Sequence, residues 1–288
     1  MKIRAPAKIN LRLRVVGRRA DGYHLLDTIM LPVSLYDEII INKGRKIVKK
    51  RALRDCITVT CDDPLVPQGR QNLVYKAASL VLNEKNINES VRIRIHKRIH
   101  VGAGLGGGST DAAATLVGLN RLFRLGYTLK RLEKMSSALG TDVPFFVKGV
   151  PARARGIGER LTPLRGVPRL WLIILYPNFP VLTAEIYRNL PLTLTKAIVN
   201  TSINCSLGSP ANLRKLLVND LETVTMARYP RIGLLKEELA RQGAVGVLMS
   251  GSGSSVFGVF QSRRSAQQAF LRLRKEREVQ AFLVRVLS

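Results

Sequence analysis

The feature that most constrains this chain is a glycine-rich loop, VGAGLGGGSTDAAATL at residues 101–116, in which five glycines occupy seven positions. Each glycine costs folding entropy, about 0.5–1 kcal/mol relative to alanine inside a regular element. The segment VRIRIHKRI before the loop alternates apolar and charged residues, which predicts a half-buried strand. The segment after the loop predicts a helix whose N-cap is Ser109, Thr110 or Asp111. The backbone between them therefore turns tightly or lets another group approach closely.

A glycine loop that opens a helix is a candidate anion site, because exposed N–H groups and the helix dipole favour negative charge. A Walker A loop is excluded, since Ser109 follows Gly108 where that motif requires a lysine. The Rossmann spacing G-x-G-x-x-G is present, but the charged alternation before it and the lack of a suitable acid about 20 residues later argue against a dinucleotide site. We predict a different phosphate loop, in which main-chain N–H groups and the hydroxyls of Ser109 and Thr110 hold the phosphates. A purely structural glycine turn is the alternative.

The other segments mix strands and helices in the order of an α+β protein. The apolar run LWLIILY at residues 170–176 predicts a buried strand, whereas KINLRLRVV at residues 8–16 alternates and predicts a half-buried one. Asn72 is the expected N-cap of a helix over residues 72–84. Further helices are expected over 128–139, 211–222, 231–242 and 265–276, and further strands within 243–260 and over 279–286.

Proline and glycine are dense between Gly149 and Pro168, which predicts a boundary between two domains. The predicted domains are residues 1–155, which hold the glycine loop, and residues 156–288.

The composition is that of a globular protein with an unusual charge. Hydrophobic residues make up 46% of the 288 residues, and 47 Lys+Arg against 20 Asp+Glu give a net charge of +27. That balance attracts phosphates, RNA and acidic membranes. The basic residues are scattered, however, and aromatic residues are only 6%, which is few for a protein that stacks bases along a strand. A solvated basic surface is the interpretation that these numbers favour.

The cysteines and the apolar runs predict a cytoplasmic protein. Cys56, Cys61 and Cys205 form no C-x-x-C pair and are odd in number, which argues against a disulfide scaffold or a zinc site and fits a reducing compartment. The segment MKIRAPAKIN lacks the apolar region of a secretory signal. The longest apolar run, LWLIILY, is too short to span a bilayer.

Two residues are candidates for phosphoryl transfer to an alcohol, a reaction that needs charge neutralisation and a group that positions or deprotonates the hydroxyl. These are Lys8 in APAKIN and Asp142 in LGTDVPFFVKG. Asp142 stands beside an apolar run, where a charge requires a partner or a function. A helix cap for Asp142 and a surface position for Lys8 are the structural alternatives, and nothing local brings the two residues together.

Taken together, these segments resemble the GHMP kinase superfamily over nearly the whole chain. APAKINLRLRVVGRRADGYHLLDTIM is similar to a first motif, GAGLGGGSTDAAA to the ATP loop, LGTDVPFFVKG to the segment with the catalytic aspartate, and VNDLE and MSGSGSSVFGVF to later motifs. Within the superfamily, DGYH and GTDVPFF resemble the kinases of a cytidine-diphosphate-linked alcohol, a CDP-alcohol, in the non-mevalonate isoprenoid route. The resemblance implies an α+β, two-domain fold with a ribosomal-protein-S5-like N-terminal domain and an α/β C-terminal domain.

The resemblance also implies roles for single residues. Asp142 and Lys8 match the catalytic pair, in which the aspartate takes or orients the hydroxyl proton and the lysine offsets developing charge. Gly251 and Gly253 would support the ATP loop. The ATP-binding residues are Gly102, Ala103, Gly104, Leu105, Gly106, Gly107, Gly108, Ser109 and Thr110; the substrate-binding residues are Asn10, Tyr23, His24, Thr183 and Tyr187, of which Tyr23, His24 and Tyr187 would grip the cytosine.

ATP is the implied cosubstrate, with Mg²⁺ expected beside it, and the CDP-alcohol is the implied partner. We expect no specific nucleic acid, no membrane, and a monomer or weak homodimer. A kinase of mevalonate or homoserine is the alternative within the superfamily, and the DGYH segment argues against it because those substrates carry no base. An RNA-binding protein is the alternative outside it, and it leaves Lys8, Asp142 and the glycine loop unexplained.

Overall fold

The computed structural model describes residues 1–46, 56–191 and 210–287. Cys205 and most of the basic segment NKGRKIVKKRALRD, residues 42–55, lie outside the described residues. The chain forms two compact units. The first comprises residues 1–7, 35–101 and 106–149, and the second comprises residues 8–34, 102–105 and 150–288. The domain boundary predicted after residue 155 stays a prediction. No helix among the described residues has the length and hydropathy needed to cross a bilayer.

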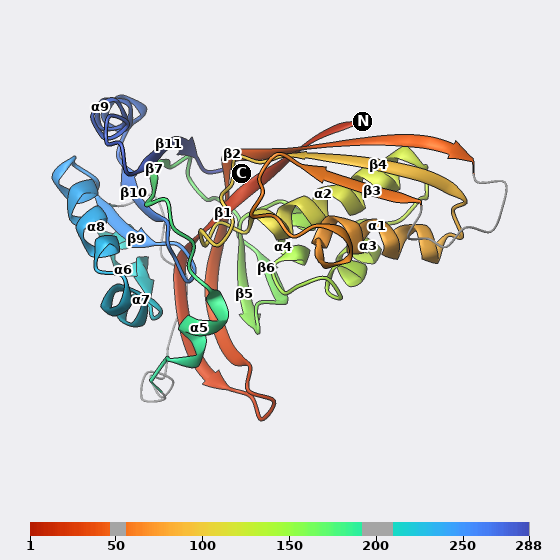
Figure 1. Ribbon diagram of the computed structural model, residues 1–288. Helices are drawn as coiled ribbons and strands as arrows, with labels where there is room; N and C mark the ends of the chain where they lie inside the picture. The colour runs from red at the N-terminus through yellow and green to blue at the C-terminus, as the bar shows by residue number, and fades with distance from the viewer. Residues whose placement is uncertain (47–55, 192–209, 288) are drawn as a thin grey trace. The chain divides into compact units, whose positions relative to one another are not determined.

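The first unit is a layer of helices on a sheet (Figure 1). Strand β4 (Glu89–His96) pairs in parallel with β3 (Ile57–Cys61) and antiparallel with the second half of β2 (His24–Lys46). Alternate residues of β4 are buried, as the sequence predicted. The remaining elements are the 3₁₀ turn η2 (Gly69–Gln71) and the helices α1 (Leu73–Glu84), α2 (Gly107–Leu122), α3 (Leu129–Ser136) and α4 (Val143–Lys148).

The sequence predicted the N-caps of two helices in this unit, and the structure confirms one of them. The Asn72 side chain accepts a hydrogen bond from the N–H of Val74 at 2.8 Å, so the predicted cap of α1 is confirmed. The prediction that Ser109, Thr110 or Asp111 caps α2 is wrong. Helix α2 begins earlier, at Gly107, and its N-cap is Gly106 in a left-handed conformation. Glycine adopts that conformation without the steric penalty that a Cβ would cause.

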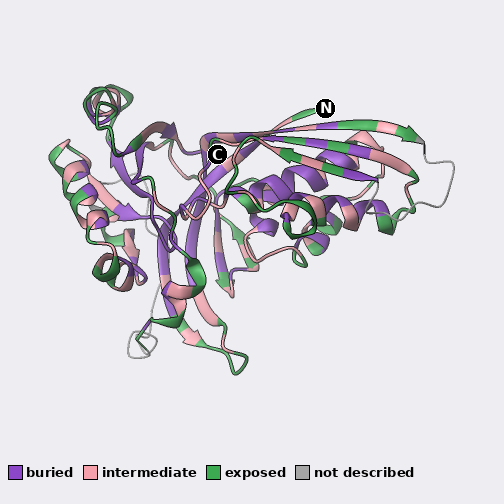
Figure 2. Cartoon of the chain, viewed as in Figure 1, coloured by how far each residue is buried: buried purple, intermediate pink, exposed green. Residues whose placement is uncertain are grey.

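The second unit contains a four-stranded antiparallel sheet in the order β11-β7-β10-β9. Ile173 and Leu175 of β7 share one buried cluster with side chains of α8 and α9, so both helices cover the same face of the sheet (Figures 1 and 2). The bounds are β7 (Trp171–Tyr176), β9 (Gly246–Met249), β10 (Val256–Phe260), β11 (Gln280–Arg285), α5 (Thr183–Arg188), α8 (Arg231–Arg241) and α9 (Arg263–Leu273).

The second unit also holds residues 8–18 of β1 (Lys2–Arg18) and residues 24–34 of β2. Strand β5 (Ala152–Gly156) pairs antiparallel with β2 and with β6 (Arg160–Pro163). The strand predicted over residues 8–16 is confirmed, but its polar face is not exposed: every residue from Ala7 to Leu13 is buried.

One predicted helix is wrong. Residues 211–222 form the end of α6 (Pro210–Leu216), the two-residue strand β8 (Val218–Asn219) and the first residue of α7 (Glu222–Arg228). Strand β8 pairs in parallel with β1, with Val218 opposite Arg12. This long-range pairing interrupts the helical periodicity, because Val218 and Asn219 find backbone partners on a neighbouring strand.

Candidate functional site

The glycine loop is built from left-handed turns. Gly102, Gly104 and Gly106 have φ values of +65°, +75° and +74°. Residues with a Cβ rarely adopt this region, so three of the five glycines are required by the backbone itself. The N–H of Thr110 donates to the carbonyl of Gly106 at 2.9 Å, which is the first turn of α2. The preceding N–H groups, those of residues 107–109, have no acceptor within the helix and are available to an anion.

The first part of the loop, residues 102–105, packs tightly within the second unit. A Cβ on Gly104 would lie 2.0 Å from the carbonyl oxygen of Ser250, and one on Gly102 would lie 2.6 Å from Cβ of Pro180. The hydroxyl of Ser250 donates to the carbonyl of Gly104 at 2.9 Å. Protein atoms therefore fill the space that a side chain on either of these two glycines would need.

The second part of the loop, within the first unit, is different. A Cβ on Gly107 would lie 2.9 Å from Nζ of Lys97, whereas one on Gly108 would meet only Cδ1 of Leu73 at 3.6 Å, an ordinary contact. Gly108 is exposed and helical. Thr110 is 1% exposed, and its hydroxyl has no hydrogen-bond partner among the described residues. A buried hydroxyl without a partner costs about 1–3 kcal/mol, so this start of α2 fits a bound phosphate.

Lys8 lies against the first part of the loop. Its N–H donates to the carbonyl of Leu105 at 3.0 Å, and its Nζ lies 3.4 Å from the position that a Cβ on Gly251 would take. The residue is 5% exposed, so the surface position considered for it is wrong. Nζ donates to Oδ1 of Asn10 at 2.5 Å. Lysines are almost never this deeply buried unless they are paired, so this ammonium depends on its polar neighbours.

Asn10 continues this polar arrangement on the same face of β1. Its Nδ2 donates to the hydroxyl of Thr28 at 2.8 Å, and that hydroxyl donates to the carbonyl of Arg12 at 2.6 Å. The amide orientation of Asn10 is thus fixed on both sides. The backbone N–H of Asn10 points to the hydroxyl of Ser250 at 3.4 Å.

Sequence reasoning missed three residues that shape this site: Thr28, Ser250 and Asn219. The Nδ2 of Asn219 donates to the carbonyls of Met249 and Gly251 at 2.9 and 2.8 Å, which holds the second glycine segment in place. The VNDLE motif contained Asn219, but its place in a predicted helix concealed this function.

The residues predicted to grip a cytosine come together in part. The rings of His24 and Tyr187 have centroids 5.2 Å apart with planes tilted by 34°. Tyr23 is 58% exposed in the turn before β2, so its side chain is open to a ligand. The hydroxyl of Thr183 lies 2.8 Å from that of Ser252, which follows Gly251. Burial, together with the positive charge of Arg18, lowers the pKa of His24 from its ordinary 6.5, so this ring is neutral at pH 7.

Asp142 lies in the first unit, half-buried, at the N-cap position of α4. Its side chain does not make the capping hydrogen bond, and Pro144 supplies the rigid start of the helix instead. The cap considered as a structural role for Asp142 is therefore not formed. Lys8 belongs to the second unit, and the pairing of Asp142 with Lys8 stays a prediction.

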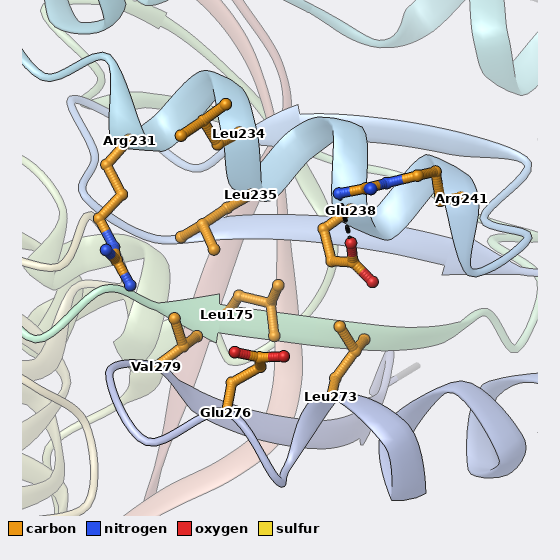
Figure 3. A pocket seen from close by; sticks show the side chains of 9 residues that line it. All are labelled: Leu175, Arg231, Leu234, Leu235, Glu238, Arg241, Leu273, Glu276 and Val279. Carbon is orange, nitrogen blue, oxygen red and sulfur yellow. Dashed lines mark ion pairs between the residues drawn. The ribbon is translucent and has the colours of Figure 1, made fainter.

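A separate hollow of about 290 Å³ lies in the second unit between α8 and α9 (Figure 3). Leu175, Leu235 and Leu273 line it, and an ion pair of 2.6 Å joins Arg241 to Glu238 at its edge. None of the residues predicted for ATP or for the substrate lines this hollow. We assign it no part in the site.

Two family models match the chain. The model described as the GHMP kinases N terminal domain matches residues 72–150, and the model described as GHMP kinases C terminal matches residues 196–278.

Curated and solved proteins agree with these matches. The 4-diphosphocytidyl-2-C-methyl-D-erythritol kinase of Citrifermentans bemidjiense is 46% identical over 289 aligned positions, which cover 100% of this chain and 99% of that protein. A crystal structure of 4-(cytidine 5'-diphospho)-2C-methyl-D-erythritol kinase is similar with a TM-score of 0.83 and 35% identity, covering 100% of both chains. The mevalonate kinase of Methanococcus jannaschii, at 14% identity and a TM-score of 0.74 with 100% and 98% covered, shows the shared fold alone.

Proposed function

We propose that this chain, which belongs to the GHMP kinase family, uses ATP to phosphorylate the 2-hydroxyl group of 4-diphosphocytidyl-2-C-methyl-D-erythritol in the non-mevalonate isoprenoid route. The observation that carries the proposal is the full-length match, at 46% identity, to a protein named as that kinase. A cytoplasmic location is part of the proposal and rests on the odd number of cysteines and the lack of a C-x-x-C pair in the sequence.

The geometry of the loop supports the use of ATP. Phosphoryl transfer depends mainly on positioning and on neutralising the phosphates. The N–H groups at the start of α2 and the buried hydroxyl of Thr110 would hold phosphate oxygens. ATP supplies the phosphoryl group that is transferred. No cluster of three or more metal-ligating side chains exists among the described residues, so Mg²⁺ would be carried largely by the triphosphate and water, as is common for this ion.

Lys8 and Asp142 would serve the hydroxyl acceptor. The ammonium of Lys8, fixed by Asn10 beside the glycine segments, would offset negative charge that develops during transfer. The carboxylate of Asp142 would take or orient the proton of the 2-hydroxyl group. Tyr23, His24, Thr183 and Tyr187 would bind the cytidine portion of the substrate.

A kinase assay with three acceptors tests the proposed function. Purified protein with ATP and Mg²⁺ is expected to phosphorylate 4-diphosphocytidyl-2-C-methyl-D-erythritol with a kcat/KM at least about 100-fold above that for mevalonate or homoserine, because a base site left empty forfeits its binding energy. The measurement is product formation followed by phosphorus NMR, which also reports the hydroxyl that is modified. Preference for mevalonate or homoserine would refute the proposed substrate.

Because His24 is neutral at pH 7, we expect kcat/KM for the cytidine substrate to fall when the pH is lowered. Because the pKa of His24 is lowered, the midpoint of its protonation should lie below the ordinary 6.5, and kcat/KM for the cytidine substrate should fall as the pH is lowered through it. The ratio of kcat/KM for wild type to that for His24→Gln, measured between about pH 5 and pH 8, isolates this step because other titrating groups are common to both proteins. We expect a constant ratio at neutral pH that declines toward acid. A ratio that declines instead on the alkaline side would contradict a neutral His24 at pH 7.

A further inference from the structure

Three charged side chains form a buried cluster in the first unit that the proposed chemistry does not use. Nζ of Lys97 lies 2.5 Å from Oδ2 of Asp37 and 2.9 Å from Oδ2 of Asp111. The side chains of Lys97, Asp37 and Asp111 are 4%, 0% and 3% exposed. Lys97 directly follows β4, Asp37 lies on β2, and Asp111 lies near the start of α2. Burial of three charges is costly, so the arrangement requires an explanation.

The cluster ties together the chain on both sides of the glycine loop. The ion pair from Lys97 to Asp111 joins a residue that precedes the loop glycines to a residue that follows them. Asp37 reinforces the first side, because its Oδ1 accepts the N–H groups of Arg98 and Ile99 at 2.6 and 2.8 Å. The entry to the loop, residues 97–99, is thus anchored to β2 by three hydrogen bonds. The start of α2 is in turn anchored to Lys97.

The ammonium of Lys97 also lies directly beside the start of α2, since a Cβ on Gly107 would be 2.9 Å from Nζ. The space that a Cβ on Gly107 would take is therefore filled by Lys97 and by the neighbouring carbonyl of Ile99, at 3.2 Å.

Burial and charge act against each other within the cluster. Burial raises the pKa of Asp111 to about 8, and the Asp37 carboxylate acts in the same direction against Lys97. Burial opposes the charge on Lys97, but Asp111 and Asp37 outweigh it and raise the pKa of Lys97. Lys97 therefore stays protonated between the two carboxylates. Oδ1 of Asp111 has no hydrogen-bond partner among the described residues.

We propose that Lys97, anchored by Asp37 and Asp111, is a positioning residue for the nucleotide: it holds the start of α2 against the entry to the loop, so that the N–H groups that receive the triphosphate keep their positions. The inference rests on the proposed use of ATP and extends it to residues outside the loop. A purely structural cluster would affect folding alone and would leave the affinity for ATP unchanged.

The test is calorimetric titration of Lys97→Met and Lys97→Gln with ATP and Mg²⁺, together with steady-state kinetics. The expected result for Lys97→Met is an ATP Kd raised by at least about tenfold, the loss equivalent to a hydrogen bond to a charged group, with a smaller change in kcat. Lys97→Gln keeps N–H donors without the charge and should lie between Lys97→Met and wild type. The control is Arg131→Met, which removes an exposed ion pair of 2.6 Å to Glu84 and should bind ATP as wild type does.

A second pair of variants, at Asp111, tests the inference even if the Lys97 variants do not fold. Asp111→Asn keeps an acceptor for Lys97 and should bind ATP within about threefold of wild type, whereas Asp111→Leu removes the acceptor and should bind about tenfold more weakly. Folded Lys97 variants, or a folded Asp111→Leu, with wild-type affinity would overturn the inference. A wild-type protein that binds ATP but does not phosphorylate the CDP-alcohol would overturn the proposed substrate and not this inference. A wild-type protein that does not bind ATP would overturn both.

Discussion

Replacing Asp142 by asparagine is expected to lower kcat by about 10²–10⁴-fold, the contribution typical of a general acid–base group. The substitution is nearly isosteric and removes one negative charge. Because the Asp142 side chain makes no capping hydrogen bond to α4, no cap is lost with it. The loss should therefore appear in turnover, while the Kd values for ATP and for the CDP-alcohol stay close to those of wild type.

The measurement combines steady-state kinetics with circular dichroism and a titration of each substrate. A matched control is Asp63→Asn, since Oδ1 of Asp63 accepts the N–H of Leu65 at 2.9 Å and an amide oxygen can do the same. That variant loses one carboxylate from the same unit and should retain wild-type turnover. A folded Asp142→Asn protein whose kcat lies within about threefold of wild type would exclude Asp142 as the catalytic group.

Replacing Gly108 by alanine is expected to weaken ATP binding while leaving the fold intact. The protein itself has room for the added methyl group, whose nearest neighbour is Cδ1 of Leu73 at 3.6 Å. Alanine is also the better helix former, so the free energy of unfolding should rise by a few tenths to about 1 kcal/mol. A phosphate that approaches the N–H groups of residues 107–109 would meet the new methyl group, and the KM for ATP should rise at least about tenfold.

Gly108→Ala should raise the free energy of unfolding and at the same time weaken ATP binding, so a loss of stability cannot explain the loss of affinity. Thermal unfolding and ATP titration are measured on the same protein. Gly233→Ala in α8 is the control, because its added Cβ meets only the flexible methyl end of Met226 at 3.2 Å, and it should leave ATP binding unchanged. Unchanged ATP affinity in Gly108→Ala would mean that the loop glycines serve the fold alone, and the ATP site would have to lie elsewhere.

Much of the fold was predictable from local patterns. The alternation in β4, the apolar run of β7 and the cap at Asn72 all gave correct predictions, because each depends on residues a few positions apart. The split of residues 211–222 into two helices and a strand was not predictable. Val218 and Asn219 fit the helical period, and only their pairing with β1 in the folded chain makes them a strand.

Strand β1 was predicted correctly, but the burial of its polar side chains was not. The alternation that includes Lys8, Asn10 and Arg12 predicted a half-buried strand with one solvent-exposed face. The structure buries these three side chains to 5%, 4% and 7% exposure, and it connects Asn10 to Lys8 and Thr28. Burial depends on what covers a strand, and the covering residues are far away in the sequence.

The sequence by itself determined that a glycine loop joins a strand to a helix, and its motifs predicted the family. Only the tertiary structure decided what each glycine is for. Gly104 accommodates Ser250, which is 146 residues away, Gly107 accommodates Lys97, and a Cβ on Gly108 would meet only Cδ1 of Leu73. A glycine is identical in the sequence whichever group approaches it, because the missing side chain records only that space is needed. The group that fills that space is set by long-range packing, which local periodicity does not encode.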